Sequence, residues 1–150
     1  MKRMGISLVL ALGLFAPALV ANAAEEKKFS DADIAKLLVG KWRFEPGRED
    51  PPIKMTITYT MDQAWSIEAE SLQVEYKVKA SGTWKVEKGE IVTTIKESTN
   101  AKEAGKVERT KVISVDDSTL KVPASVIAPT GVPVPIEELR ELVIVFKKVK

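Results

Sequence analysis

Alternation of apolar and polar side chains with a period of two is the feature that most constrains the fold of this chain. It is clearest in residues 53–60, where Ile53, Met55, Ile57 and Tyr59 alternate with lysine and threonine. Successive side chains of a β-strand point to opposite faces, so this spacing predicts a strand with one buried and one solvated face. The pattern therefore indicates a core built largely from sheet.

The same period recurs along most of the chain after residue 40. It predicts strands at residues 41–45, 53–60, 65–70, 72–79, 82–87, 90–96, 107–115, 119–122 and 142–149. Turn residues separate most of these segments, and Lys88-Gly89 is a two-residue hairpin signal. Serial short strands of this kind predict an all-β fold, a small antiparallel barrel of about eight strands. Closure of the barrel would also remove the exposed edges of an open sheet.

One short helix is predicted before the strands. Ser30 is a capping residue, and Asp31 and Asp33 complement the positive end of a helix dipole. Ile34 begins an apolar face, and Gly40 is a suitable residue to end the helix. A helix of only about two to three turns is unstable alone, so we expect it to lie on a sheet or across a barrel mouth.

The first 23 residues have the pattern of a secretory signal peptide. Lys2 and Arg3 form a basic start, residues 6–20 are mostly apolar, and Ala21-Asn22-Ala23 has the small-x-small form of a signal-peptidase site. The apolar run is short for a membrane span, although an uncleaved anchor is the alternative. We expect cleavage near Ala23, a periplasmic or secreted protein without a transmembrane segment, and one barrel domain in residues 24–150.

Composition argues against several classes of function. Without Lys2 and Arg3, the basic residues fall from 23 to 21 and balance the 21 acidic residues. A dedicated nucleic-acid binder needs a basic surface, so we expect no nucleic-acid partner. The chain has no His and no Cys, which excludes imidazole relays, thiol nucleophiles, disulfide bonds and the usual zinc or copper ligands. We therefore expect no cofactor, no metal and no enzymatic activity.

The remaining polar groupings each have a plain structural interpretation. Glu68 and Glu70 share a strand face that is polar throughout, which predicts solvation rather than carboxylate chemistry. Asp116-Asp117 lies in a predicted turn, where Asp caps its own backbone, and a calcium site is the alternative. The lysines of residues 77–88 are interleaved with glutamates, which favours a mixed solvated face over a basic patch.

Six aromatic side chains fall on the apolar faces of the predicted strands. They are Trp42, Phe44, Tyr59, Trp65, Tyr76 and Trp84. A barrel of about eight strands is either filled by its own side chains or holds one small ligand. The rings are therefore either ordinary core or the lining of a cup for a small apolar or amphipathic molecule, and they are the candidate ligand-binding residues.

A proline-rich connection at residues 123–138 interrupts the alternation. Its candidate contact residues are Val126, Ile127, Val132, Val134 and Ile136. Proline stiffens such a segment and removes backbone donors, so the segment is a loop over the core, a lid, or an arm that docks on a partner protein. The arm belongs to a second hypothesis, an envelope interaction module such as an inhibitor, immunity or assembly factor. That module would act through this loop or through the outer surface.

A helix, then Gly40-Lys41-Trp42 at the start of the first strand, then serial hairpins, resembles the lipocalin group. The chain is similar to the small lipocalin-like domains of bacterial secreted and periplasmic proteins, which often carry a second such strand start, as at Gly82-Thr83-Trp84. The resemblance implies a barrel with Trp42 closing one end, and non-covalent binding or a structural role. In larger lipocalins a late basic residue packs on this tryptophan, and Arg109 and Arg140 are both candidates.

Residues 40–45 and 82–87 share the pattern Gly, any residue, Trp, basic, apolar, Glu. The likeness is either the trace of a duplicated half-barrel or the convergence of two strands that enter a core from a tight turn. Six residues are few for a repeat, which favours convergence.

Overall fold

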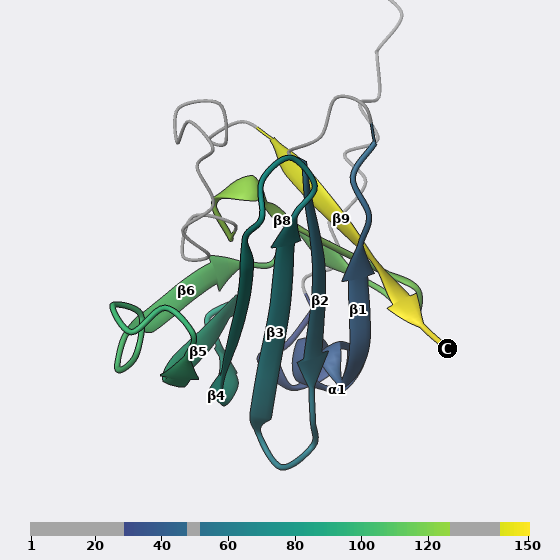
Figure 1. Ribbon diagram of the computed structural model, residues 1–150. Coiled ribbons are helices and arrows are strands. Elements are labelled where there is room, and N and C mark those ends of the chain that lie inside the picture. The colour runs from purple at the N-terminus through teal and green to yellow at the C-terminus, as the bar shows by residue number, and fades with distance from the viewer. Residues whose placement is uncertain (1–28, 48–51, 127–141) are drawn as a thin grey trace, which may run out of the picture.

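The computed structural model describes residues 29–47, 52–126 and 142–150 (Figure 1). In this part of the chain, nine antiparallel strands form one sheet, and one short helix precedes them. The sheet is strongly curled into an open half-barrel. The predicted all-β antiparallel class with one N-terminal helix is therefore confirmed at this level of detail.

Most strands pair with the next strand along the chain. The elements are α1 (Asp31–Leu38), β1 (Gly40–Phe44), β2 (Ile53–Tyr59), β3 (Ala64–Ser71), β4 (Lys77–Glu87), β5 (Glu90–Ser98), β6 (Val107–Lys111), β7 (Ser114–Val115), β8 (Thr119–Pro123) and β9 (Val143–Val149). The sheet order is β6-β5-β4-β3-β2-β1-β9-β8-β7. The pairing of β9 with β1 joins the two ends of the described chain in the middle of the sheet.

The prediction of a closed barrel is wrong, because the sheet has two edges, β6 and β7. The prediction of a single strand at residues 107–115 is also wrong, because this segment contains both edge strands, β6 and β7, with a break between them. At Val112 and Ile113 the chain steps from one edge to the other: the Val112 amide donates to the Gly89 carbonyl at 3.1 Å, and the Ile113 amide donates to the Lys121 carbonyl at 2.9 Å. Two successive amides thus bond to opposite sides of the gap, which breaks the strand.

The two strands predicted at residues 72–79 and 82–87 are also wrong as separate elements. Residues 72–76 connect β3 to β4, and Leu72 and Val74 are exposed. Residues 77–87 form one strand with a register shift between Ser81 and Gly82. A bulge of this kind bends a strand and lets it follow a curled sheet. The alternation of apolar and polar residues continues through residues 72–78, so it gave no sign that the β3–β4 hairpin turns within this segment.

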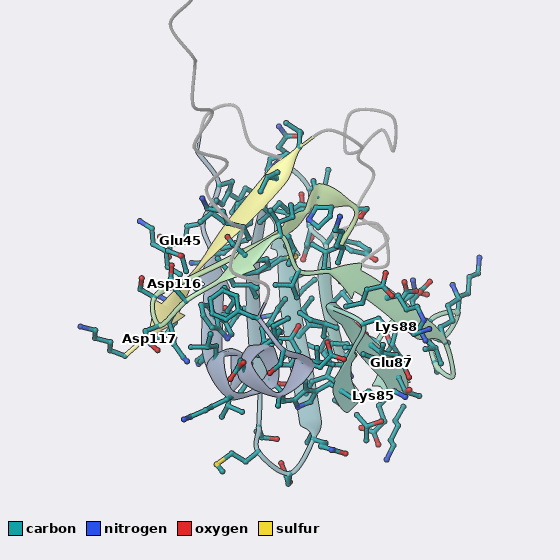
Figure 2. All side chains as sticks on the ribbon, turned by 180° about the vertical axis from the view of Figure 1, so that it is seen from behind. Glu45, Lys85, Glu87, Lys88, Asp116 and Asp117 are labelled. Atoms are coloured by element: carbon teal, nitrogen blue, oxygen red, sulfur yellow. The ribbon has the colours of Figure 1, made fainter. Side chains whose placement is uncertain are left out.

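Helix α1 begins as predicted. The Ser30 hydroxyl oxygen accepts from the Asp33 amide at 3.2 Å, and the Asp33 carboxylate accepts from the Ser30 amide at 3.3 Å. The Asp31 carboxylate accepts from the amides of Lys88 and Gly89, both at 2.8 Å, which fastens the helix to the β4–β5 hairpin. Figure 2 shows the helix across the lower end of the sheet, with Lys88 on one side of it.

The side chain of Trp42 is fully buried at the base of the half-barrel. Its indole nitrogen donates to the Leu38 carbonyl at 2.7 Å. The Lys148 ammonium lies 5.0 Å from the centroid of the Trp42 ring and donates to the Leu37 carbonyl at 2.9 Å. The Trp42 side chain therefore connects β1, α1 and β9.

The late basic residue on Trp42 is thus Lys148, opposite Trp42 in the β1–β9 register. Arg109 instead pairs with two glutamates, and Arg140 lies outside the described residues. The sequence did contain a signal for this position, because Lys148 continues the alternation that places Ile144 and Phe146 on one face of β9.

The two Gly-x-Trp segments differ in structure. Gly40 has a φ of +135°, which favours glycine, whereas at Gly82 an added Cβ would lie 1.8 Å from the Thr94 carbonyl oxygen. The Trp84 indole donates to the Thr60 carbonyl at 3.1 Å, so it bonds to a strand connection rather than to the helix. The two segments thus share a residue pattern but need glycine for different physical reasons, backbone conformation at Gly40 and space at Gly82. This difference favours convergence over duplication.

Candidate ligand pocket

A pocket of about 80 Å³ lies on the concave face of the sheet. Its apolar walls come from β2, β3, β4 and β5, namely Ile57, Tyr59, Trp65, Ile67, Val78, Ala80, Ile91 and Ile95. Its polar lining comes from β5, β6 and the connections beside them, namely Thr93, Ser98, Glu103, Glu108, Arg109, Thr110 and Ser125. The pocket therefore has an amphipathic lining.

The lining joins residues that come from opposite ends of the strand order. Glu108 and Thr110 belong to β6, whereas Ser125 and Val126 follow β8. A volume of about 80 Å³ corresponds to roughly three water molecules at about 30 Å³ each. Space of this size suits a short alkyl segment.

Two of the six predicted rings, Tyr59 and Trp65, line this pocket. Burial raises the pKa of the Tyr59 hydroxyl far above its ordinary value, so the group stays protonated at neutral pH. The Trp65 indole donates to the Thr94 carbonyl at 3.4 Å, a long contact. The Tyr59 and Trp65 side chains are therefore both uncharged walls of the pocket at neutral pH.

The other four rings lie elsewhere. Trp42 is at the base, and the Phe44 ring packs against Phe146 with 5.8 Å between ring centroids. The Trp84 ring packs edge-on against Tyr59, with 5.0 Å between centroids. Tyr76 is half-buried just before β4 and packs against the core. These rings form part of the hydrophobic core, and none of them lines the pocket.

Of the predicted loop residues, Val126 lines the pocket from a short turn at residues 124–126. Ile127, Val132, Val134 and Ile136 lie outside the described residues, as does the predicted signal peptide at residues 1–23.

Sequence reasoning missed the polar part of the lining, above all Glu108. This side chain is half-buried on β6 and lies opposite Thr93 of β5. Burial raises the pKa of the Glu108 carboxyl, the negative charge of Glu103 adds to that effect, and Lys106 opposes it. The alternation of residues 107–111 places Glu108 and Thr110 on one face, but only the tertiary structure shows that this face is concave.

The other polar candidates have structural partners. Exposed Glu68 pairs with Lys79 at 2.9 Å, and the hydrogen bond from Lys79 lowers the pKa of the Glu68 carboxyl. The Asp116 carboxylate accepts from the backbone and hydroxyl groups of Ser118 and Thr119, as expected for a turn. In the described ranges, no group of three or more acidic residues is arranged to hold a metal ion.

The lysines interleaved with glutamates form a mixed solvated surface, as predicted. Lys85 pairs with Glu87 at 3.3 Å, and Arg109 pairs with Glu87 at 2.7 Å and with Glu90 at 3.2 Å. Lys85 and Glu87 lie at the outer side of the molecule (Figure 2). The register places Val92 between Lys85 and Arg109, so these long side chains flank the buried Val92 on the outer face.

None of the helices that the structure describes is long and apolar enough to cross a membrane. In comparisons with known proteins, no family model matches the chain, and no match is found among curated proteins.

Proposed function

We propose that this chain is an exported, non-enzymatic binding protein of lipocalin-like type, which holds a small apolar or amphipathic ligand in its half-barrel. The observation that carries the proposal is the pocket of about 80 Å³ between Tyr59 and Trp65 on one side and polar residues of β6 on the other. Ligand sites commonly combine apolar walls with a few convergent polar groups. Export is supported by the signal-peptide pattern of residues 1–23.

Isothermal titration of the mature protein with short alcohols and amines tests the proposal directly. The informative variant is Ala80→Leu, because Ala80 lines the pocket and a larger side chain there fills it. The matched control is Ser66→Leu, which adds the same side chain at an exposed position of β3. We expect Ala80→Leu to weaken binding by about tenfold or more, and Ser66→Leu to leave it unchanged. Equal affinities for both variants would locate binding elsewhere.

Native mass spectrometry of the protein from a bacterial envelope fraction tests export and occupancy together. Cleavage after Ala23 leaves residues 24–150, so the expected mass is that of this mature chain plus a small molecule. Retention of residues 1–23 would contradict cleavage.

An interaction module is the second candidate function. It is favoured by the exposure of Val143 and Val145 on β9, at 47% and 39%. Exposed apolar residues on a strand can mark a protein contact. A protein partner in the native mass spectrum, in place of a small molecule, would favour this candidate.

A further inference from the structure

The charge balance around the pocket narrows the class of ligand. Three described lining residues carry charge, namely Glu103, Glu108 and Arg109. The Arg109 guanidinium donates to Glu87 and Glu90, so its charge is neutralised on the outer face. Glu103 pairs with Lys106 at 2.9 Å. Within the described ranges, Glu108 has no ion pair and no side-chain hydrogen bond.

The placement of Glu108 makes this lack of a partner significant. In β6 the side chains of Val107, Arg109 and Lys111 are exposed, whereas Glu108 and Thr110 are half-buried. Glu108 therefore lies on the concave side, in the lining that also contains the Trp65 and Tyr59 rings. Lys106 attracts the Glu108 carboxylate but makes its ion pair with Glu103. A partly desolvated carboxylate without a direct ion pair costs free energy, and a cation beside it recovers much of that cost.

We propose that the ligand is a cationic amphipath, whose apolar end lies against Tyr59 and Trp65 and whose ammonium group pairs with Glu108. This inference rests on the proposed function, because it names the class of ligand for the same pocket. The volume limits the enclosed apolar part of the ligand to a short alkyl segment, because it gives room for roughly three waters.

Three probes of equal length and different head charge test the inference. They are n-hexylamine, 1-hexanol and hexanoate, titrated calorimetrically into the mature protein at pH 7.5. We expect hexylamine to bind roughly tenfold or more tightly than hexanol, as a charged hydrogen bond predicts, and hexanoate to bind most weakly. Failure of all three to bind would overturn the proposed function and the inference with it. If hexanol or hexanoate binds as tightly as hexylamine, the inference alone falls.

The Glu108→Gln variant tests the assigned residue. It keeps the shape of the side chain and removes the charge, so hexylamine should lose roughly tenfold in affinity and hexanol should lose little. The matched control is Glu97→Gln, which makes the same charge change at an exposed position of β5 outside this lining. An unchanged preference for hexylamine in Glu108→Gln would overturn the assignment. Near-ultraviolet circular dichroism checks whether both variants retain the native packing.

Discussion

At the scale of single residues, two polar side chains hold specific backbone groups. The Lys148 ammonium lies over the Trp42 ring and donates to the Leu37 carbonyl. The Asp116 carboxylate accepts from amides and hydroxyls of the turn that leads into β8. Both contacts involve a charged group, which makes the hydrogen bonds stronger than those between neutral groups. Each contact predicts a measurable loss when its charge is removed.

Replacement of Lys148 by Met should destabilise the fold by about 1–2 kcal/mol, because it removes the cation over the Trp42 ring and the bond to the Leu37 carbonyl. Urea unfolding followed by tryptophan fluorescence measures the effect. The control is Lys147→Met, which changes an exposed neighbour on the other face of β9 and should cost less than about 0.5 kcal/mol. Equal costs for the two variants would mean that the contact with Trp42 adds nothing.

Asp116 should make stability depend on pH in the acid range. Hydrogen bonds from the Thr119 hydroxyl, and then from Ser118 and the Thr119 amide, lower the pKa of the Asp116 carboxyl. The folded pKa lies below the unfolded one, so this contribution is present above about pH 4 and is lost as the pH falls further. The difference in unfolding free energy between the wild type and Asp116→Asn should therefore shrink between pH 5 and pH 2. A difference in unfolding free energy that stays constant over this pH range would contradict the prediction. The control is Asp117→Asn.

At the scale of elements, the register shift within β4 marks an irregularity in the curled sheet. The register shift after Ser81 coincides with the close approach of Gly82 to the backbone of β5. Glycine is needed there for space, because any Cβ would meet a backbone carbonyl that cannot move alone.

The Gly82→Ala variant should lose about 3 kcal/mol or more, since its Cβ would start 1.8 Å from the Thr94 carbonyl oxygen. Thermal unfolding of the purified variant measures the loss. Gly105→Ala is the control: Gly105 has a φ of +84° but open space around it, so only the backbone strain of about 1–2 kcal/mol is expected. If Gly82→Ala costs no more than Gly105→Ala, the close approach does not require glycine at position 82.

At the scale of the whole molecule, β9 joins the two halves of the sheet. It pairs with β1 on one side and β8 on the other, and it carries Ile144 and Phe146 into the core. The chain has no Cys, so no disulfide can replace this connection.

Deletion of residues 142–150 should abolish cooperative unfolding. Loss of the buried Ile144 and Phe146 alone removes roughly 1.5–3 kcal/mol for each side chain, against a total stability of about 5–15 kcal/mol. Calorimetry would show no unfolding peak for this deletion and a normal peak for the control that lacks only Lys150, which lies beyond β9. A cooperative peak without β9 would show that β1 and β8 hold their places independently.

The sequence alone determined the local features of this protein. The Ser30 cap, the Lys88-Gly89 hairpin turn and the alternation of β2 depend on neighbours in the chain, and each was predicted from them. The choice of Lys148 over Arg109 depended on strand register, although alternation already placed Lys148 on the inner face of β9. The cap, the turn and the alternation follow from contacts between residues close in sequence, whereas the Lys148 contact joins strands distant in sequence.

Only the tertiary structure decided how the sheet ends and what its concave face holds. The break at Val112 and Ile113, the inward face of Glu108 and the choice of Tyr59 and Trp65 as pocket walls depend on strands distant in sequence. Alternation gives two faces to every strand but does not state which face is inward at a sheet edge. That choice is made when remote strands meet, because burial is a property of the assembled sheet rather than of the local sequence.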